Sequence, residues 1–268
     1  MIDEYYMNNK KNVAFTGVFL AILSLQTNVS HAEGTFSLTS GIDYSSGKYG
    51  QSDSTDITYI PFVAKYEMEN TTLKITVPWV SITGPGDVVG GNTPIVLGTS
   101  NRPVTTQEGL GDIVISATQT VAKIGESHPL ILDITGKVKL ATASSSKNLG
   151  TGENDYTAAL DAYKPINNSV TLFGGVGYKH MGDPAGINLN NVWFSSVGLS
   201  YKINPSSSMG VMADARQATS NTSTALRELT VFLTHKYNVH YKLQSYITHG
   251  YSDASTDWGG GLMLSRLF

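Results

Sequence analysis

Charged side chains occupy one face of many alternating segments in this sequence. Most of them stand singly among Ser, Thr and Gly, and both signs are present. The candidate residues are Lys74, Asp112, Asp133, Lys137, Lys139, Asp155, Asp161, Lys179, Asp214, Arg216, Glu228 and Lys236, with Asp43 and Lys202 on the same kind of face. If these faces line one enclosed space, the charges form either a constriction that selects solutes or a network of salt bridges that stiffens a narrow barrel. The sequence leaves both alternatives open.

The sequence offers little for covalent or metal chemistry. It has no cysteine, which excludes disulfide scaffolds, cysteine zinc sites, iron–sulfur clusters and thiol nucleophiles. His180, His235, His240 and His249 have no neighbouring motif of the kind that activates a nucleophile. The loop carboxylates lack the ligand spacing of a calcium site, and a net charge of -3 leaves no basic surface for nucleic acid. We therefore predict no catalytic residue, no metal and no cofactor.

The amino-terminal segment resembles a secretory signal. The apolar run 13–25 follows two lysines and ends before small residues, of which Ala32 suits cleavage by a signal peptidase. The run is shorter than the roughly 20 residues that a spanning helix needs. We predict a cleaved signal peptide over 1–32, and we leave open whether translation starts at Met1 or Met7.

From residue 33 onwards, apolar residues alternate with small or polar ones at a period of two. In 170–178, for example, Val170, Leu172, Val176 and Tyr178 share one face. One apolar face per strand also accounts for the 15% charged residues, where about 25% is usual. The predicted strands are 34–46, 54–68, 71–83, 108–122, 129–141, 153–164, 169–180, 190–202, 207–217, 226–237, 240–251 and 257–268.

The connections between these strands alternate in length. Those after even-numbered strands are short, and those after odd-numbered strands are mostly long and rich in Gly, Ser, Asn, Asp and Pro. This is typical of outer-membrane barrels, which have short periplasmic turns and longer extracellular loops. We predict an all-β fold, a transmembrane antiparallel β-barrel of about 12 strands over 33–268 of the outer-membrane type, following the signal peptide.

Aromatic residues near strand ends support a membrane barrel over a soluble β-sandwich or barrel, because interfacial belts need them. A soluble barrel would also carry its charges outside. The chain ends at Phe268 on an apolar strand face, the usual signal for the barrel assembly machinery. The predicted belt residues are Tyr44, Tyr59, Tyr66, Trp79, Tyr156, Tyr163, Tyr178, Trp193, Tyr201, Tyr237, Tyr241, Tyr251 and Trp258.

The connection from Gly84 to Gln107 is unusually long for a loop without structure of its own. It contains Ile95, Val96 and Leu97 among Gly and Pro, which is unusual for a segment in water. Two interpretations stand: a lid that folds over or into the mouth with an apolar contact site, or a surface loop packed on its neighbours.

Pro61 and Pro78 interrupt two predicted strands that a tight turn connects. Pairing about that turn places the two prolines opposite one another. Each proline removes a backbone hydrogen-bond donor, and a barrel has no free edge where proline is normally tolerated. We predict a local gap or bulge in the wall, with outward exit of an apolar solute as one use and a harmless strand bend as the alternative.

Several motifs resemble a known family of bacterial outer-membrane proteins. They are SITGPGDVV at 81–89, GLGDIVISAT at 109–118, ITGKVKLATA at 134–143, LGTGENDYTAALDAYK at 149–164, RELTVFLTHK at 227–236 and DWGGGLMLS at 257–265. The family is the MetA-pathway of phenol degradation family of transporter-like proteins, and the resemblance covers nearly all of 33–268 in matching order. It implies an outer-membrane barrel that passes small aromatic or other poorly soluble nutrients.

The favoured function is an outer-membrane channel or facilitator for small molecules, aromatic or hydrophobic ones among them. The alternatives are a structural or adhesive barrel with a plugged lumen, and a barrel enzyme that modifies lipids. The expected partners are outer-membrane lipids, the barrel assembly machinery and a small-molecule solute, without nucleic acid. The identity of the solute, the state of the lumen and the oligomeric state are left open.

Overall fold

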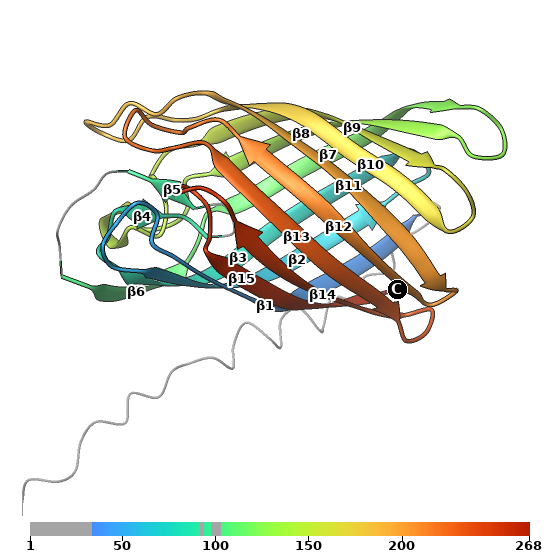
Figure 1. Cartoon of the computed structure of the whole chain (residues 1–268), viewed down its shortest axis with the longest axis horizontal. Helices are drawn as coiled ribbons and strands as arrows, with labels where there is room; N and C mark the ends of the chain where they lie inside the picture. The colour runs from blue at the N-terminus through green and yellow to red at the C-terminus, as the bar shows by residue number, and fades with distance from the viewer. Residues whose placement is uncertain (1–33, 92–93, 98–102) are drawn as a thin grey trace, which may run out of the picture. The chain divides into compact units, whose positions relative to one another are not determined.

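The structure, a computed structural model, describes residues 34–91, 94–97 and 103–268. The predicted signal peptide, 1–32, lies outside the described residues. Figure 1 shows long strands inclined around one axis. The strands are β1 Thr35–Gly47, β2 Thr55–Glu67, β3 Thr71–Gly84, β4 Val88–Val89, β5 Ile95–Val96, β6 Thr105–Leu110, β7 Ile113–Ile124, β8 Leu130–Leu140, β9 Asp155–Pro165, β10 Val170–His180, β11 Val192–Asn204, β12 Ser207–Arg216, β13 Leu226–Lys236, β14 Tyr241–Gly250 and β15 Trp258–Leu267.

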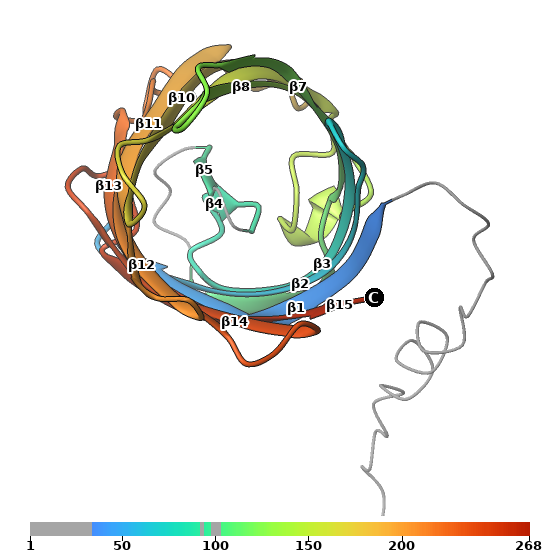
Figure 2. The ribbon, with the colours of Figure 1, turned by 90° about the vertical axis from the view of Figure 1, so that its right-hand side faces the viewer.

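Neighbouring strands of the barrel are antiparallel and follow chain order. β1 also pairs with β15, from Ser37 opposite Leu267 to Ser46 opposite Trp258, which closes the sheet on itself. The closed ring is visible in Figure 2. Closure leaves no free edge, so the backbone groups of the wall pair within the protein. The predicted fold class, a 12-stranded antiparallel barrel of the outer-membrane type, is confirmed.

One of the twelve wall positions is shared by two strands. β3 pairs with β7 along its first half, up to Thr76, and with β6 along its second half, from Trp79. The break between β6 and β7 falls at Gly111 and Asp112. The single strand predicted over 108–122 is therefore divided in the structure.

Helix plays almost no part in the described residues. A single turn of 3-10 helix, Ser145–Lys147, lies in the loop between β8 and β9. No helix in the described part of the chain is long and apolar enough to cross a membrane.

The outer face carries an apolar band between two aromatic belts. In the band, side chains such as Ile42, Leu160 and Val231 are 44–49% exposed, which suits acyl chains rather than water. The exposed aromatic residues of the belt at the long-loop end are Tyr44, Tyr156, Tyr178, Trp193, Tyr251 and Trp258. Those at the short-turn end include Phe36, Tyr201, Tyr237, Tyr241 and Phe268.

Two residues predicted for these belts, Tyr59 and Tyr163, face the lumen instead. Tyr59 is two residues from the buried Ile57, and Tyr163 is two residues from Asp161 and directly opposite the lumen-facing Phe173. Position near a strand end decides the height of a residue in the membrane. Its face depends on the pleat, which alternates with every residue, so these two assignments were wrong.

The short-turn end of the closing seam is fixed by aromatic packing. The rings of Phe36 and Phe268 lie 5.7 Å apart, and the Phe268 N–H donates to the Phe36 carbonyl oxygen at 2.9 Å. The Arg266 guanidinium stands 4.6 Å from the centre of the Phe268 ring. The last residue of the chain therefore holds the first strand in place.

Gly41→Val is expected to prevent closure of the barrel. A Cβ at Gly41 would overlap the backbone carbonyl oxygen of Leu262 on β15, and that oxygen belongs to the closing ladder. Overpacking of this kind typically costs about 1–3 kcal/mol, and we expect loss of the heat-dependent shift in gel mobility that marks a folded barrel. Gly136→Val is the matched control, because a Cβ there meets nothing within 4 Å; equal loss in both variants would contradict the prediction.

Candidate lumen site

Four of the predicted charged residues form one chain of ion pairs at the long-loop end of the lumen. Lys139 Nζ lies 3.1 Å from Asp112 Oδ2 and 3.4 Å from Asp155 Oδ2. Lys179 Nζ lies 2.8 Å from the same Asp155 oxygen. The side chain of Asp155 is 1% exposed and those of both lysines are 17% exposed. Two carboxylates thus neutralise two ammonium groups in a largely dry setting.

The same carboxylates hold the loops of the mouth. Asp112 Oδ1 accepts hydrogen bonds from the backbone N–H groups of Thr142 at 3.1 Å and Ala143 at 2.9 Å. Asp155 Oδ1 accepts one from the N–H of Gly182 at 3.2 Å. Each carboxylate therefore joins a lysine of the wall to a loop, as expected of a network that fixes local structure.

A second group of predicted residues lies on β12 and β13 without close ion pairs. Asp214 stands directly opposite Glu228 in the register. Glu228 Oε1 accepts a hydrogen bond from the Thr256 N–H at 3.1 Å, and Arg216 Nη2 donates to the Pro94 carbonyl oxygen at 3.2 Å. Arg216 thus contacts the loop between β3 and β6 rather than a carboxylate.

Mid-height in the lumen, like charges lie near one another. Asp133 is opposite Asp161, and Thr120 Oγ1 donates to Asp133 Oδ1 at 2.7 Å. Lys74 and Lys137 flank the same serine of β7, one from β3 and one from β8. Within the described residues, none of these four charges has an ion-pair partner within 4.0 Å. None of the four charges is therefore held in a close ion pair.

Lys236 is separate from all of these groups. It lies at the short-turn end of β13, opposite Lys242. The twelve candidates therefore fall into four sets: a paired network at the mouth, three charges towards the long-loop end of β12 and β13 without close ion pairs, four charges lower in the lumen, and one lysine at the far end.

The period-two alternation of apolar and polar residues in the sequence assigns no role to the aromatic residues that face the lumen. Phe173, Phe194, Phe232 and Tyr246 lie on β10, β11, β13 and β14, and the rings of Phe173 and Phe232 are 6.3 Å apart. We call this surface the aromatic wall. Thr118, Thr120 and Thr135 of β7 and β8 join the charges of β3, β8 and β9 to form the polar wall. The lumen therefore has an aromatic side and a polar side, and Lys179, Asp214, Arg216 and Glu228 add charged groups on the strands of the aromatic side.

Each phenylalanine of the aromatic wall lies over a glycine of a neighbouring strand. A Cβ on that glycine would overlap the ring, so the absent side chain is what makes room for it. The pairs are Phe173 over Gly198, Phe194 over Gly177 and Phe232 over Gly210. The signal that could have found them is a glycine and a phenylalanine directly opposite across two strands, which requires the register.

Tyr246 adds a polar contact at the edge of the aromatic wall. Its hydroxyl donates a hydrogen bond to Asp43 Oδ2 across β15. Glycines on the intervening β15, Gly261 among them, make room for this side chain. The residue thus presents its ring on the aromatic wall while its hydroxyl satisfies a lumen carboxylate.

β4 and β5 form a small hairpin inside the mouth, which we call the mouth hairpin. Val88 pairs with Val96 and Val89 with Ile95, and Figure 2 shows both strands within the ring of the barrel. The predicted residues Ile95 and Val96 are each 4% exposed. Predicted residue Leu97 packs against the same apolar cluster as Ile95.

The two sides of the mouth hairpin contact opposite parts of the barrel. Val88 and Val96 belong to a buried cluster with wall and loop residues: Tyr49, Ile57, Val80, Ile82, Ala143 and Leu149. Val89 and Ile95 belong to another with Met181, Leu189 and Val192. The hairpin therefore bridges the β2–β3 wall and the connection between β10 and β11. Ser220 Oγ also donates to the Val96 carbonyl oxygen at 3.4 Å.

Tyr49, in the loop after β1, is a buried member of the first of these clusters. Its side chain is 3% exposed, and its hydroxyl lies 3.1 Å from Thr256 Oγ1. Burial raises the pKa of Tyr49 to about 12. The hydroxyl therefore stays protonated at neutral pH.

Pro61 and Pro78 are directly opposite in the register of β2 and β3. The pairing between β2 and β3 runs through the two prolines without a break. The pairing of each strand with its other neighbour is interrupted at the same height. Towards β1, pairing jumps from Phe62 to Tyr59. Towards β7 and β6, pairing stops at Thr76 and resumes at Trp79. The missing proline donors thus fall on the two sides that face away from the hairpin.

One serine and one histidine do come together on the outer face. Ser207 Oγ lies 2.9 Å from His235 Nδ1, and the His235 ring packs edge-on against Tyr237. No described residue is hydrogen-bonded to the other imidazole nitrogen, so the third member of a catalytic triad is lacking there. Nor do three His, Asp or Glu side chains of the described segments gather to hold a metal ion.

Comparison with solved structures finds the same barrel fold in outer-membrane proteins. The COG4313 outer membrane channel from Pseudomonas putida F1 superposes with a TM-score of 0.60 at 12% identity, over 88% of this chain and 94% of that one. A KdgM porin superposes with a TM-score of 0.52 at 10% identity, over 87% and 99%. No family model and no curated protein matches the sequence. The likeness is one of fold.

Asp155→Asn is expected to loosen the mouth. The substitution removes the carboxylate shared by Lys139 and Lys179 and leaves two buried ammonium groups with less compensation. Breaking a buried pair in this way costs about 3–5 kcal/mol, measurable as a lower urea midpoint and faster proteolysis of the long loops. Glu67→Gln is the control, because its pair with Lys65 is 42% and 31% exposed and worth at most about 1 kcal/mol. Equal destabilisation by both variants would refute a special role for the network.

Proposed function

We propose that this chain is an outer-membrane channel for small molecules that combine an apolar or aromatic face with a polar or anionic group. The observation that carries the proposal is the division of the lumen into an aromatic wall and a polar wall. A solute of this kind would lie with its ring on Phe173 and Phe232 and its polar group towards β7, β8 and β9.

Both walls offer contacts of modest strength, as passage requires. A ring-on-ring contact contributes about 0.5–1.5 kcal/mol beyond burial. On the polar wall, Lys74 and Lys137 have no carboxylate within 4.0 Å among the described residues, so a carboxylate or phenolate would find a cation there. Binding that is weak and divided over several sites allows release as well as entry.

Several further features support the location and route. The apolar outer band with its two aromatic belts supports the outer membrane, which the chain would reach through the predicted signal peptide 1–32. Phe268, packed on Phe36, is the residue through which the barrel assembly machinery would recognise the last strand. The resemblance to the MetA-pathway of phenol degradation family supports aromatic solutes. We assign the protein no catalytic role.

The paired prolines support a second exit for apolar solutes. Ladder pairing fails on both sides of the β2–β3 hairpin at the height of Pro61 and Pro78. A solute that leaves the lumen there would enter the membrane directly, and the harmless bend remains the competing interpretation.

One observation favours a different function, a structural barrel with a plugged lumen. The mouth hairpin is buried between two apolar clusters and is hydrogen-bonded to Arg216 at the end of β12 and to Ser220 in the loop that follows. If this arrangement never opens, no solute passes. Measured flux separates the two functions.

The channel is tested by swelling of proteoliposomes in isosmotic benzoate or arabinose. We expect benzoate influx through the unchanged protein, and a reduction of about 5- to 150-fold when Phe173 and Phe232 are both replaced by Ser, since each of the two lost ring contacts is worth about 0.5–1.5 kcal/mol. Arabinose influx should change little. Phe62→Ser, on the outer face of β2, is the control variant. Absence of influx for both solutes would favour the plugged barrel.

The exit between strands is tested by restoring the missing donors. Pro61→Val with Pro78→Val is expected to raise the urea midpoint, since each regained hydrogen bond contributes about 0.5–1.5 kcal/mol. Uptake of an uncharged aromatic solute should fall, while ion conductance along the lumen should stay unchanged. Pro165→Val, at the end of β9, serves as control. Unchanged uptake in the double variant would leave the harmless bend as the explanation.

A further inference from the structure

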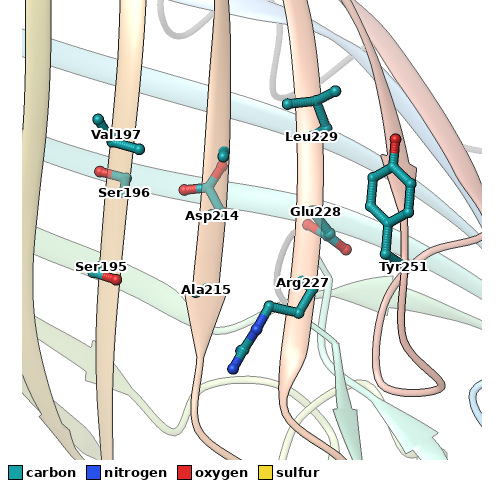
Figure 3. Close-up of a pocket in the computed structure, with 10 residues that line it drawn as sticks. Ser195, Ser196, Val197, Asp214, Ala215, Arg227, Glu228, Leu229 and Tyr251 are labelled. Carbon is teal, nitrogen blue, oxygen red and sulfur yellow. The ribbon is translucent and has the colours of Figure 1, made fainter.

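A hollow of about 600 Å³ crosses β11, β12 and β13 near the long-loop end of the barrel. Seven of its ten lining residues belong to the outward-facing set of β11, β12 and β13 or, for the last of them, continue that of β14. They are Ser195, Val197, Ala213, Ala215, Arg227, Leu229 and Tyr251. The hollow forms where the wall carries short side chains between longer ones, and it lies on the membrane side at the height of the aromatic belt. Figure 3 shows Val197 at one side, Tyr251 at the other and Arg227 between them.

Arg227 places a positive charge at this hollow. Its Nη1 donates to the backbone carbonyl oxygens of Leu226 at 2.7 Å and Arg216 at 3.5 Å. Its neighbour Tyr251 is 65% exposed and donates its backbone N–H to the Arg227 carbonyl oxygen at 2.8 Å. Among the described residues, no carboxylate forms an ion pair with Arg227. Asp214 and Glu228 also line the hollow, but both belong to the lumen-facing set of their strands, so within the described residues no counter-charge pairs with the guanidinium on the membrane side.

A cation at a membrane boundary that has no carboxylate partner is stabilised by an anionic group of the membrane. Arginine binds phosphate oxygens through two parallel hydrogen bonds, and its weakly hydrated guanidinium suits partly apolar surroundings. On its membrane side the hollow is lined mainly by apolar side chains, Val197, Ala213 and Leu229 among them, which suits an acyl chain. One ligand that carries phosphate and acyl chain together satisfies both features.

We propose that the hollow and Arg227 bind one molecule of the phosphorylated, acylated glycolipid of the outer leaflet, with an acyl chain in the hollow and a phosphate on the guanidinium. The long loops mark the outer side, so this belt meets lipid A of lipopolysaccharide. Phospholipid of the inner leaflet meets the other belt, at Arg266 and Phe268. The proposal rests on the membrane location alone and is independent of transport.

The test measures retention of lipopolysaccharide without O-antigen on the purified barrel in detergent, by native mass spectrometry. We expect Arg227→Gln to weaken retention about 10- to 100-fold, the usual range for a lost charge-assisted hydrogen-bond pair. Ala215→Leu, which fills the hollow from the outside, should weaken it about tenfold, as loss of two buried methylene groups would. Arg266→Gln, in the opposite belt, should leave retention unchanged.

Two further arms identify the ligand chemistry. Lipid A stripped of its phosphates should bind unchanged protein as weakly as intact lipid binds the Arg227→Gln variant, and phosphatidylglycerol should bind less tightly than lipopolysaccharide. Equal weakening by Arg227→Gln and Arg266→Gln, or equal binding of the two lipids, would overturn the proposal. A heat-dependent gel shift confirms folding of each variant. Benzoate influx, measured in parallel, separates a failure of this site from a failure of the channel.

Discussion

The pairing of every backbone donor and acceptor of the wall is the constraint on which this structure depends. A bilayer offers no water to an unpaired N–H or C=O group, and the β1–β15 seam removes the edges that an open sheet would leave. Closure also fixes the pleat all round the ring, so each residue of a strand faces either lipid or lumen. The apolar band, the two aromatic belts and the two lumen walls all follow from that division.

The main departure from complete pairing also organises the mouth. Pro78 has no N–H to offer, and opposite it the neighbouring strand breaks at Gly111 and Asp112. The Gly111 N–H still donates to the Pro78 carbonyl oxygen at 2.9 Å. Asp112, released from the ladder, reaches Lys139 and the loop after β8. A proline on one strand thus frees a carboxylate on the next for the ion-pair network.

The sequence predicts best what depends on neighbours along the chain. The strand expected at 169–180 is observed at Val170–His180, because period-two alternation is a local signal. The division of 108–122 was missed because its cause lies on β3. The position of the mouth hairpin depends on contacts such as Val89 with Met181. Likewise, no local pattern pairs Phe173 with Gly198. Such contacts are missed because the two partners are far apart in the chain, whatever their residue types.

The glycines beneath the phenylalanines have a consequence for the bore of the barrel. A ring lies close to the wall only while its partner strand has a hydrogen atom where other residues have carbon. A single methyl group at Gly198 or Gly210 would displace a whole ring towards the axis. The width of the lumen therefore depends on the glycines that lie behind the rings. Related barrels can differ in the size of the molecules they admit without any change in the residues that contact those molecules.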